Sequence, residues 1–259
     1  MLSVFAKANP MDVIQPWIAV VAGSVLLLYL LTAYGPIRRL YGNPGSVSAK
    51  EVTLFTFASV TLYLSFGGPL DYISDNYLFS AHMFQHMTEI VIMTPLFIAG
   101  TPDWMVRRLL DSRLVQNASA QHTHPIFTGL IFNGVIAIFH IPQIYDFALE
   151  NEAFHFFEHL CFFVVALILW RSLWDLTPGR KMLALLLNYN LGMPLVIFMI
   201  IARHPWYTFY VSRPRIWPWL TPLADQQWGA IIMAVMMMGA FAVVGVRAYA
   251  KQDESIWYA

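Results

Sequence analysis

The chain has 259 residues, of which 58% are hydrophobic and only 12% are charged. A soluble domain carries about 25% charged residues, so this composition indicates a chain that folds in a lipid bilayer. The formal net charge is zero, which excludes the basic surface that proteins use to bind nucleic acid. The chain has a single cysteine, Cys161, and therefore forms no intrachain disulfide.

Seven apolar runs follow one another along the chain, and each falls within the roughly 17–25 residues that a helix needs to cross the hydrocarbon. The sequence pattern lacks alternating strands, so helices are the structure that satisfies the backbone in lipid. We therefore predict a single transmembrane domain over residues 1–259, an all-α bundle of seven helices. The predicted helices lie near residues 17–34, 51–67, 77–100, 125–142, 153–174, 181–202 and 226–248.

Two segments at the edges of these runs carry positive charge. The first run is followed by Gly35, Pro36 and two arginines, which favours an uncleaved spanning helix over a signal peptide with a small-residue cleavage site. The segment 103–113 mixes Trp104 and Leu109 with arginines, a pattern typical of a short amphipathic helix on the membrane surface. Both segments are expected beside a membrane boundary.

The distribution of Lys and Arg predicts the orientation, because cytoplasmic loops carry an excess of positive residues. Eleven of the 15 Lys and Arg residues lie in the 35–51, 102–124 and 171–181 connectors and the C-terminal part of the chain. The other four lie in the N-terminal segment and the remaining connectors. We therefore predict an outside N-terminus and a cytoplasmic C-terminus, which requires an odd number of spans and agrees with seven.

Five of the eight histidines fall near the predicted outer ends of three adjacent helices. His82 and His86 are four residues apart, as are His155 and His159, so each pair shares one helix face. Polar side chains at membrane depth are costly and usually mark function. Because imidazole suits copper, zinc and iron, we predict a metal site formed by these four histidines and His140.

Further polar and sulfur-bearing side chains lie at similar predicted depth. Glu158 adjoins the second histidine pair, Glu89 continues the face of the first, and the methionine thioethers favour copper in its reduced state. We predict supporting roles around the metal for Asp71, Met83, Glu158, Asp225, Gln227 and Met233, with Asn133 as a further candidate acceptor. Plainer interpretations exist for the same side chains: the methionines can fill the core, and the polar residues can cap helices.

The remaining histidines have ordinary interpretations. His140 can equally be a hydrogen-bonded core residue, His122 and His124 lie in a predicted loop, and His204 begins an aromatic connector. The segment 155–159 also matches a short protease pattern of two histidines with a glutamate before the second. Since a protease needs a third ligand and an activated water, an intramembrane metalloenzyme is a minor alternative to a protein that only handles metal.

Several blocks around these residues resemble the multi-spanning CtaG family of cytochrome c oxidase assembly proteins. The blocks are Gly68-Pro69-Leu70-Asp71, Ser80-Ala81-His82-Met83-Phe84-Gln85-His86, His140-Ile141-Pro142, Tyr145-Asp146, Glu158-His159 and Ala224-Asp225-Gln226-Gln227. The second block is the most specific part of the resemblance, which runs over nearly the whole chain.

The resemblance implies an assembly factor for a haem-copper oxidase in a bacterial plasma membrane. It implies copper as the metal, and subunit I of the oxidase or a related copper membrane enzyme as the partner. The copper-containing centre of such an oxidase lies toward the outer side of subunit I. The predicted histidine site lies at the same level of the membrane.

Alternatives from other classes stay open on the sequence alone. A haem-binding redox membrane protein would use one axial histidine from each of two helices, such as His86 and His159. A metal-free scaffold would hold an oxidase subunit through its lipid-facing surface. A di-metal membrane oxygenase also uses histidines four apart, but its site is expected on the cytoplasmic side. The sequence also leaves a homo-oligomer open.

Overall fold

The computed structural model describes residues 8–42, 45–110, 124–174 and 176–257. Within these residues every regular element is a helix and no strand occurs, which confirms the predicted all-α class. His122 and the end of the predicted surface helix, residues 111–113, lie outside the described residues.

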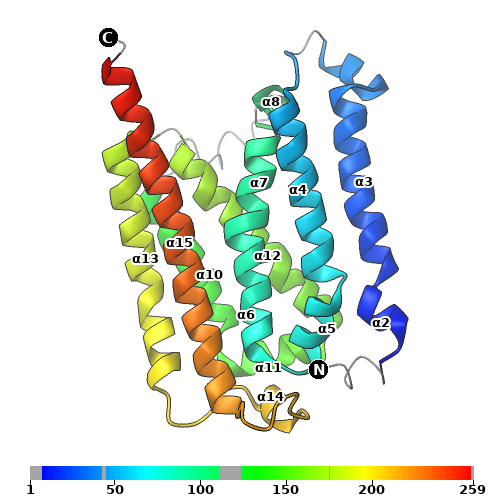
Figure 1. Cartoon of the computed structure of the whole chain (residues 1–259), viewed down its shortest axis with the longest axis vertical. Helices are drawn as coiled ribbons and strands as arrows, with labels where there is room; N and C mark the ends of the chain where they lie inside the picture. Colours follow the sequence, from blue (N-terminus) through cyan, green and yellow to red (C-terminus); the bar gives the residue numbers. More distant parts are fainter. Residues whose placement is uncertain (1–7, 43–44, 111–123, 175, 258–259) are drawn as a thin grey trace.

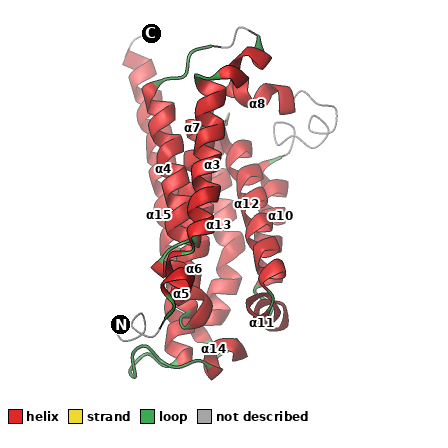
Figure 2. Ribbon diagram, turned by 90° about the vertical axis from the view of Figure 1, so that its right-hand side faces the viewer, coloured by secondary structure: helices red, strands yellow, loops and turns green. Residues whose placement is uncertain are grey.

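The helices run along the long axis of the molecule as a bundle, with a few short helices at its two ends (Figures 1 and 2). In chain order they are α2 (Pro10–Ile14), α3 (Pro16–Ala33), η1 (Pro36–Tyr41), α4 (Ala49–Phe66), α5 (Pro69–Asn76), α6 (Phe79–Thr88), η2 (Glu89–Met93), α7 (Thr94–Gly100), α8 (Asp103–Leu110), α10 (Pro125–Phe139), α11 (Pro142–Glu150), α12 (Glu152–Trp174), α13 (Pro178–Ile201), α14 (Thr208–Ser212) and α15 (Pro222–Trp257).

Over the described residues, five helical segments are long and apolar enough to cross a membrane. The bent pair of α10 and α11 makes a sixth if the two form one span. The predicted run 77–100 is helical from Phe79 to Gly100 but is divided among α6, η2 and α7. The structure therefore supports a multi-pass membrane protein, whereas the number of seven spans and their orientation stay predictions.

The predicted helix 125–142 is not one straight helix. α10 ends at Phe139, and α11 begins at Pro142 at an angle of 70° to it. A proline favours the first position of a new helix but cannot donate the backbone hydrogen bond that would continue the previous one. His140 therefore lies at a corner between two helices rather than on a helix face.

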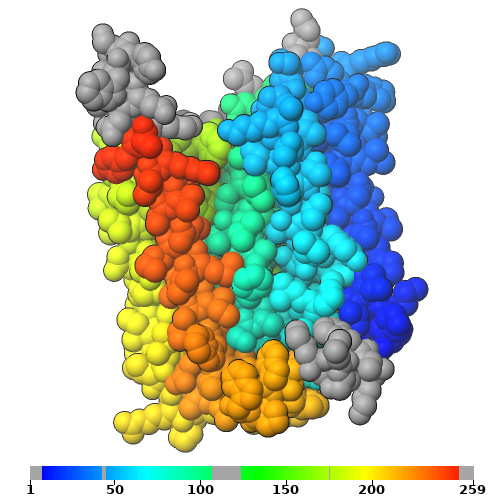
Figure 3. Space-filling view, viewed as in Figure 1, coloured from blue at the N-terminus to red at the C-terminus, as the bar shows by residue number. Residues whose placement is uncertain are grey.

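The two ends of the bundle differ. α2, α5, α11 and α14 gather at one end, which we call the α11 end (Figures 1 and 2). α8 and the C-terminal part of α15 lie at the opposite end. Figure 3 shows α13 and α15 side by side, with the connection between them covering part of the α11 end.

The helical run from α6 to α7 contains the π turn η2, which has a clear cause. Pro95 has no N–H to donate. The Thr94 N–H bonds to the carbonyl of Glu89, five residues back, so the Ile90 carbonyl has no backbone donor in its own helix. Trp170 of α12 donates its indole N–H to the Ile90 carbonyl at 2.8 Å. This bond joins α12 to the middle of the α6–η2–α7 run.

α6 also packs closely against α15. A Cβ atom at Gly229 would lie 2.5 Å from the ring of Phe79, so this contact requires glycine. The neighbouring Ala230 is fully buried. The first turn of α6 is therefore packed against α15, and His82 and His86 follow in the same helix.

We expect Trp170→Phe to destabilise the protein by about 1–3 kcal/mol, because it leaves the buried Ile90 carbonyl without a donor. Thermal unfolding of the detergent-purified protein measures the change. Trp174→Phe is the matched control, since Trp174 is exposed on the same helix. Equal shifts in the two variants would contradict a role for the indole N–H.

Candidate metal centre

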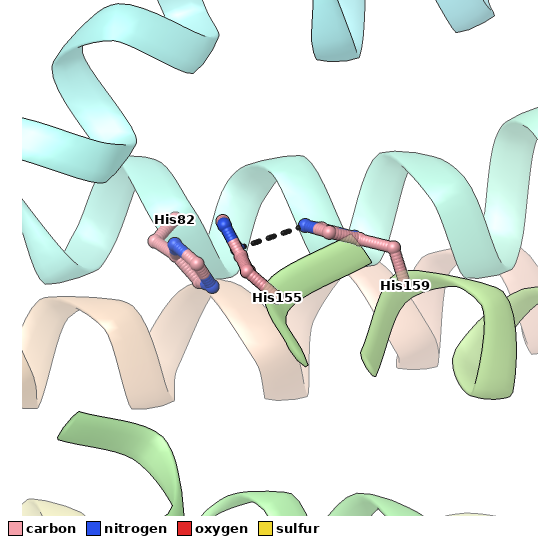
Figure 4. Close-up of side chains that lie close together, drawn as sticks. All are labelled: His82, His155 and His159. Atoms are coloured by element: carbon pink, nitrogen blue, oxygen red, sulfur yellow. Dashed lines mark hydrogen bonds between the residues drawn. The ribbon is translucent and has the colours of Figure 1, made fainter. Parts of the chain in front are cut away.

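Four histidines come together between α6 and α12. His82 and His86 share one face of α6, and His155 and His159 share one face of α12, because one helical turn separates each pair. Figure 4 shows His82, His155 and His159 side by side. The ring centroids are 4.2 Å apart for His82 and His86, 5.2 Å for His82 and His155, and 4.6 Å for His86 and His159. The structure brings together four of the five histidines predicted as ligands.

Two glutamates lie among these rings. Glu89 Oε2 is 2.9 Å from His159 Nδ1, and Glu158 Oε1 is 3.8 Å from His86 Nε2. Both glutamates are buried. Glu158, for which we predicted a supporting role, lies close enough to be a ligand itself. The sequence indicated Glu89 only through its position three residues after His86, on the same helix face.

A third carboxylate, Asp75, lies at the edge of the cluster. Its Oδ1 is 3.7 Å from His82 Nδ1, and its Oδ2 is 3.7 Å from His155 Nδ1. Sequence reasoning missed this residue. It lies in the last turn of α5, which a break at residues 67–68 separates from α4, and helical periodicity does not predict such a break.

Several polar atoms of the cluster have no hydrogen-bond partner among the residues that the structure describes. They are both ring nitrogens of His82, both ring nitrogens of His86, and Glu158 Oε1. A buried polar atom without a partner costs about 1–3 kcal/mol, so packing alone does not account for this arrangement. Because a neutral imidazole offers one lone pair, a bound cation would take up one nitrogen of each ring together with the carboxylate oxygen. The residues present therefore fit a metal ion.

Three overlapping groups of side chains each place their ligand atoms within 4.8 Å of one another. The groups are His82–His155–His159, His82–His86–Glu158 and His86–Glu89–His159. Sets of three histidines, or of two histidines and a glutamate, are common at metal sites that keep a position open. The ligand types suit copper, zinc and iron.

His140, the fifth predicted ligand, lies outside these groups. Its Nδ1 is 2.8 Å from the Ile136 carbonyl oxygen, and its Nε2 is 3.3 Å from Met83 Sδ. The Met83 thioether therefore faces His140 at the corner after α10. Asn133, also on α10, lies 3.3 Å from Asn188 Oδ1 through its Nδ2 and so bridges α10 to α13.

Three other predicted supporting residues hold the bundle together. Asp71 accepts a hydrogen bond from Gln85 Nε2 at 2.8 Å, which ties α5 to α6. Gln227 donates to the Ile200 carbonyl at 2.8 Å, and Met233 belongs to the main apolar core. Each has a structural contact that explains its presence.

Asp225 caps α6 from a distant part of the chain. Its Oδ2 accepts from the Phe79 N–H at 2.9 Å, and its Oδ1 accepts from the Ser80 N–H at 3.0 Å. The first amide groups of a helix have no partner within it, and a negative charge there also interacts well with the helix dipole. Asp225 belongs to α15, so it caps another helix rather than its own.

Aromatic side chains cover the cluster on the side of α11. Tyr145 is 1% exposed, and its ring centroid lies 5.4 Å from that of His82. The Tyr207 ring packs on Tyr145 with a centroid separation of 4.1 Å. These rings keep water from that side of the histidines.

The sequence profile of one protein family matches most of the chain. The family is the cytochrome c oxidase caa3 assembly factor, Caa3_CtaG, and the match covers residues 27–251. The chain belongs to the Caa3_CtaG family. This confirms the resemblance seen in the sequence blocks, and every residue of the four-histidine cluster lies within the range that matches Caa3_CtaG. No curated protein and no solved structure matches the chain.

For this Caa3_CtaG protein, we expect Asp225→Ala to lower the free energy of unfolding by about 1–2 kcal/mol, because the first turn of α6 loses its cap. Thermal unfolding in detergent measures the loss. Asp225→Asn is the control, since it keeps an oxygen acceptor and should lose less. An alanine variant that unfolds at the wild-type temperature would show that the cap is dispensable.

Proposed function

We propose that this protein binds copper at the four-histidine cluster and supplies it to a haem-copper oxidase during assembly. The observation that carries the proposal is the set of unpartnered, buried ring nitrogens of His82 and His86 beside two buried glutamates. The Caa3_CtaG family consists of cytochrome c oxidase assembly factors, which suggests the client. The role is to hold and pass on a metal rather than to turn over a substrate.

The charge of the cluster favours a bound cation. Within the described residues, the ion-pair contacts of Glu89 and Glu158 are to histidines. Burial disfavours the ionised form of a carboxylate, and buried carboxylates in proteins are ionised where they are paired with a cation or bound to a metal. A divalent copper ion would supply the missing positive charge.

The ligand types favour oxidised copper over the reduced copper suggested by the sequence. Thioether sulfur selects Cu(I), whereas imidazole and oxygen ligands suit Cu(II). Met83 faces His140, and Met233 packs in the apolar core. The ligands close to one another are therefore nitrogen and oxygen atoms.

A haem fits the same space less well. Axial ligation by two histidines requires one on each side of the macrocycle, with room for the ring between them. His86 and His159 have centroids 4.6 Å apart, and His82 stacks on His155 at 5.2 Å. The four imidazoles fill the space that a macrocycle would need.

The position of the cluster also suits the proposed client. α6 and α12 both begin at the α11 end, so the histidines lie toward that end (Figure 1). With the predicted orientation, the α11 end faces the outer side of a bacterial plasma membrane. The copper-containing centre of oxidase subunit I lies toward the same side, which makes subunit I the proposed partner.

We expect the purified protein to retain copper when copper is supplied, and His86→Ala and His159→Ala to lose most of it. Each of these histidines belongs to two of the three ligand groups. Copper per protein, measured by mass spectrometry after desalting, is the readout. The wild-type content should fall as the pH is lowered, because protons compete for the same imidazole lone pairs.

His140→Ala is the matched control, because it removes a buried imidazole that lies outside the three groups. This variant should keep its copper. Full copper content in both cluster variants would place the site elsewhere. A wild-type protein that binds no copper would favour the metal-free scaffold.

In cells that lack this protein, we expect low haem-copper oxidase activity that added copper partly restores. The wild-type chain and His140→Ala should restore activity, whereas the double variant of His86→Ala and His159→Ala should not. Oxidase activity and copper content of isolated membranes measure the effect. Normal values for both in the deletion strain would argue against the proposal.

A further inference from the structure

The exposure of the side chains falls along the line from Asp75 through His155 and His159 to Glu89. It is 31% at Asp75, 13% at His155, 11% at His159 and 2% at Glu89. Asp75 lies in the last turn of α5, which is at the α11 end (Figure 1). An accessible carboxylate and a buried carboxylate therefore stand at opposite ends of a line of imidazoles.

Apolar packing closes the cluster in other directions. Beyond His159, the same face of α12 carries Phe162 and Leu169, both 0% exposed. Tyr145 covers His82 on the side of α11. Of the charged side chains that touch the histidines within the described residues, Asp75 is the most exposed. We call its position the mouth of the cluster.

Asp75 is placed to pass a cation to both helices. Each of its oxygens lies 3.7 Å from the Nδ1 of a different imidazole, His82 on α6 and His155 on α12. These distances are too long for hydrogen bonds. Metal bonds to imidazole nitrogen and carboxylate oxygen are about 2.0–2.2 Å long, so one ion can bind both atoms across such a gap.

A chain of polar contacts holds Asp75 in this position. Ser74 Oγ lies 2.9 Å from Asp75 Oδ1 and 2.7 Å from Gln85 Oε1. Gln85 belongs to α6 and also donates to Asp71 Oδ1 at 2.8 Å. The Ser74 hydroxyl has one hydrogen to share among these acceptors, and the Gln85 contacts join α5 to α6 beside Asp75.

The three ligand groups share members from the mouth inward. His82 and His159 belong to the group that contains His155, and each also belongs to one of the two groups that contain His86. An ion can therefore move from one group to the next by exchanging two ligands while the shared histidine stays bound. The movement requires no electron transfer.

We propose that Asp75 is the transfer ligand through which copper both reaches and leaves the cluster. The proposal rests on the proposed function, because copper is the cargo. The carboxylate takes a Cu²⁺ ion at the mouth and passes it to His82 and His155, and the ion leaves by the same route. A ligand of this kind controls the rates of loading and release, whereas the deeper residues set how much copper is held.

The test compares Asp75→Asn with the wild-type full-length protein in detergent. Copper is supplied as its glycine complex, loading is followed by stopped-flow quenching of tryptophan fluorescence, and release is followed after addition of EDTA. We expect both rates to fall by about tenfold or more in Asp75→Asn, since the local negative charge and the transfer ligand are lost. Copper per protein at equilibrium should stay at the wild-type level.

Two further variants separate the possible causes. Asp75→Glu keeps the carboxylate and should retain most of the wild-type rate. Asp146→Asn removes another negative charge at the α11 end, where Asp146 accepts hydrogen bonds from the Thr208 and Phe209 N–H groups. This variant should load at the wild-type rate.

Wild-type rates in Asp75→Asn would overturn the transfer role and leave the proposed function intact. Loss of the copper held at equilibrium would also overturn it, because Asp75 would then be a resident ligand. If copper loading slowed equally in Asp146→Asn, the effect would be one of surface charge alone, and the transfer role would again be overturned. A wild-type protein that binds no copper would instead contradict the proposed function itself.

Discussion

The site depends on one constraint: a helix in lipid must pair its backbone groups within the protein. Pro95 has no N–H to donate, and the Ile90 carbonyl has no backbone donor in its own helix. The indole N–H of Trp170 donates to this carbonyl instead. The bond fixes the position of α12 along the axis of the α6–η2–α7 run, which carries His82 and His86. The 2.9 Å contact between Glu89 and His159 joins the same two helices. These two contacts therefore set the register of α12 against the helix that carries the first histidine pair.

Hydrogen-bond satisfaction separates the structural polar residues from the functional ones. Asp71 and Asp225 are buried, and each has partners that explain it: Asp71 binds a glutamine side chain, and Asp225 binds two backbone amides. His82 and His86 are buried to the same degree and have none for their ring nitrogens. All four look alike as polar residues in an apolar sequence. The difference between them lies in contacts between helices that are far apart in the chain.

The sequence predicted the parts of the site that depend on spacing within a helix. Two pairs of histidines four residues apart each had to share a face, and the structure brings these pairs together. It did not reveal the features that depend on where a helix bends. His140 lies at the 70° corner between α10 and α11 and outside the three ligand groups, and Asp75 lies beyond the break at residues 67–68 between α4 and α5. Helical periodicity describes a straight rod and carries no information about such corners.

The cap that Asp225 provides for α6 has a consequence for biosynthesis. The histidines of α6 and α12 leave the ribosome well before α15, but the carboxylate that fixes the first turn of α6 belongs to α15 and lies 146 residues from Phe79 in the sequence. A nascent chain that has already inserted both histidine pairs therefore still lacks the Asp225 carboxylate, which caps the helix that carries His82 and His86. The order of translation keeps the cluster unfinished until the last helix enters the membrane, so a truncated chain carries the ligands without a completed site.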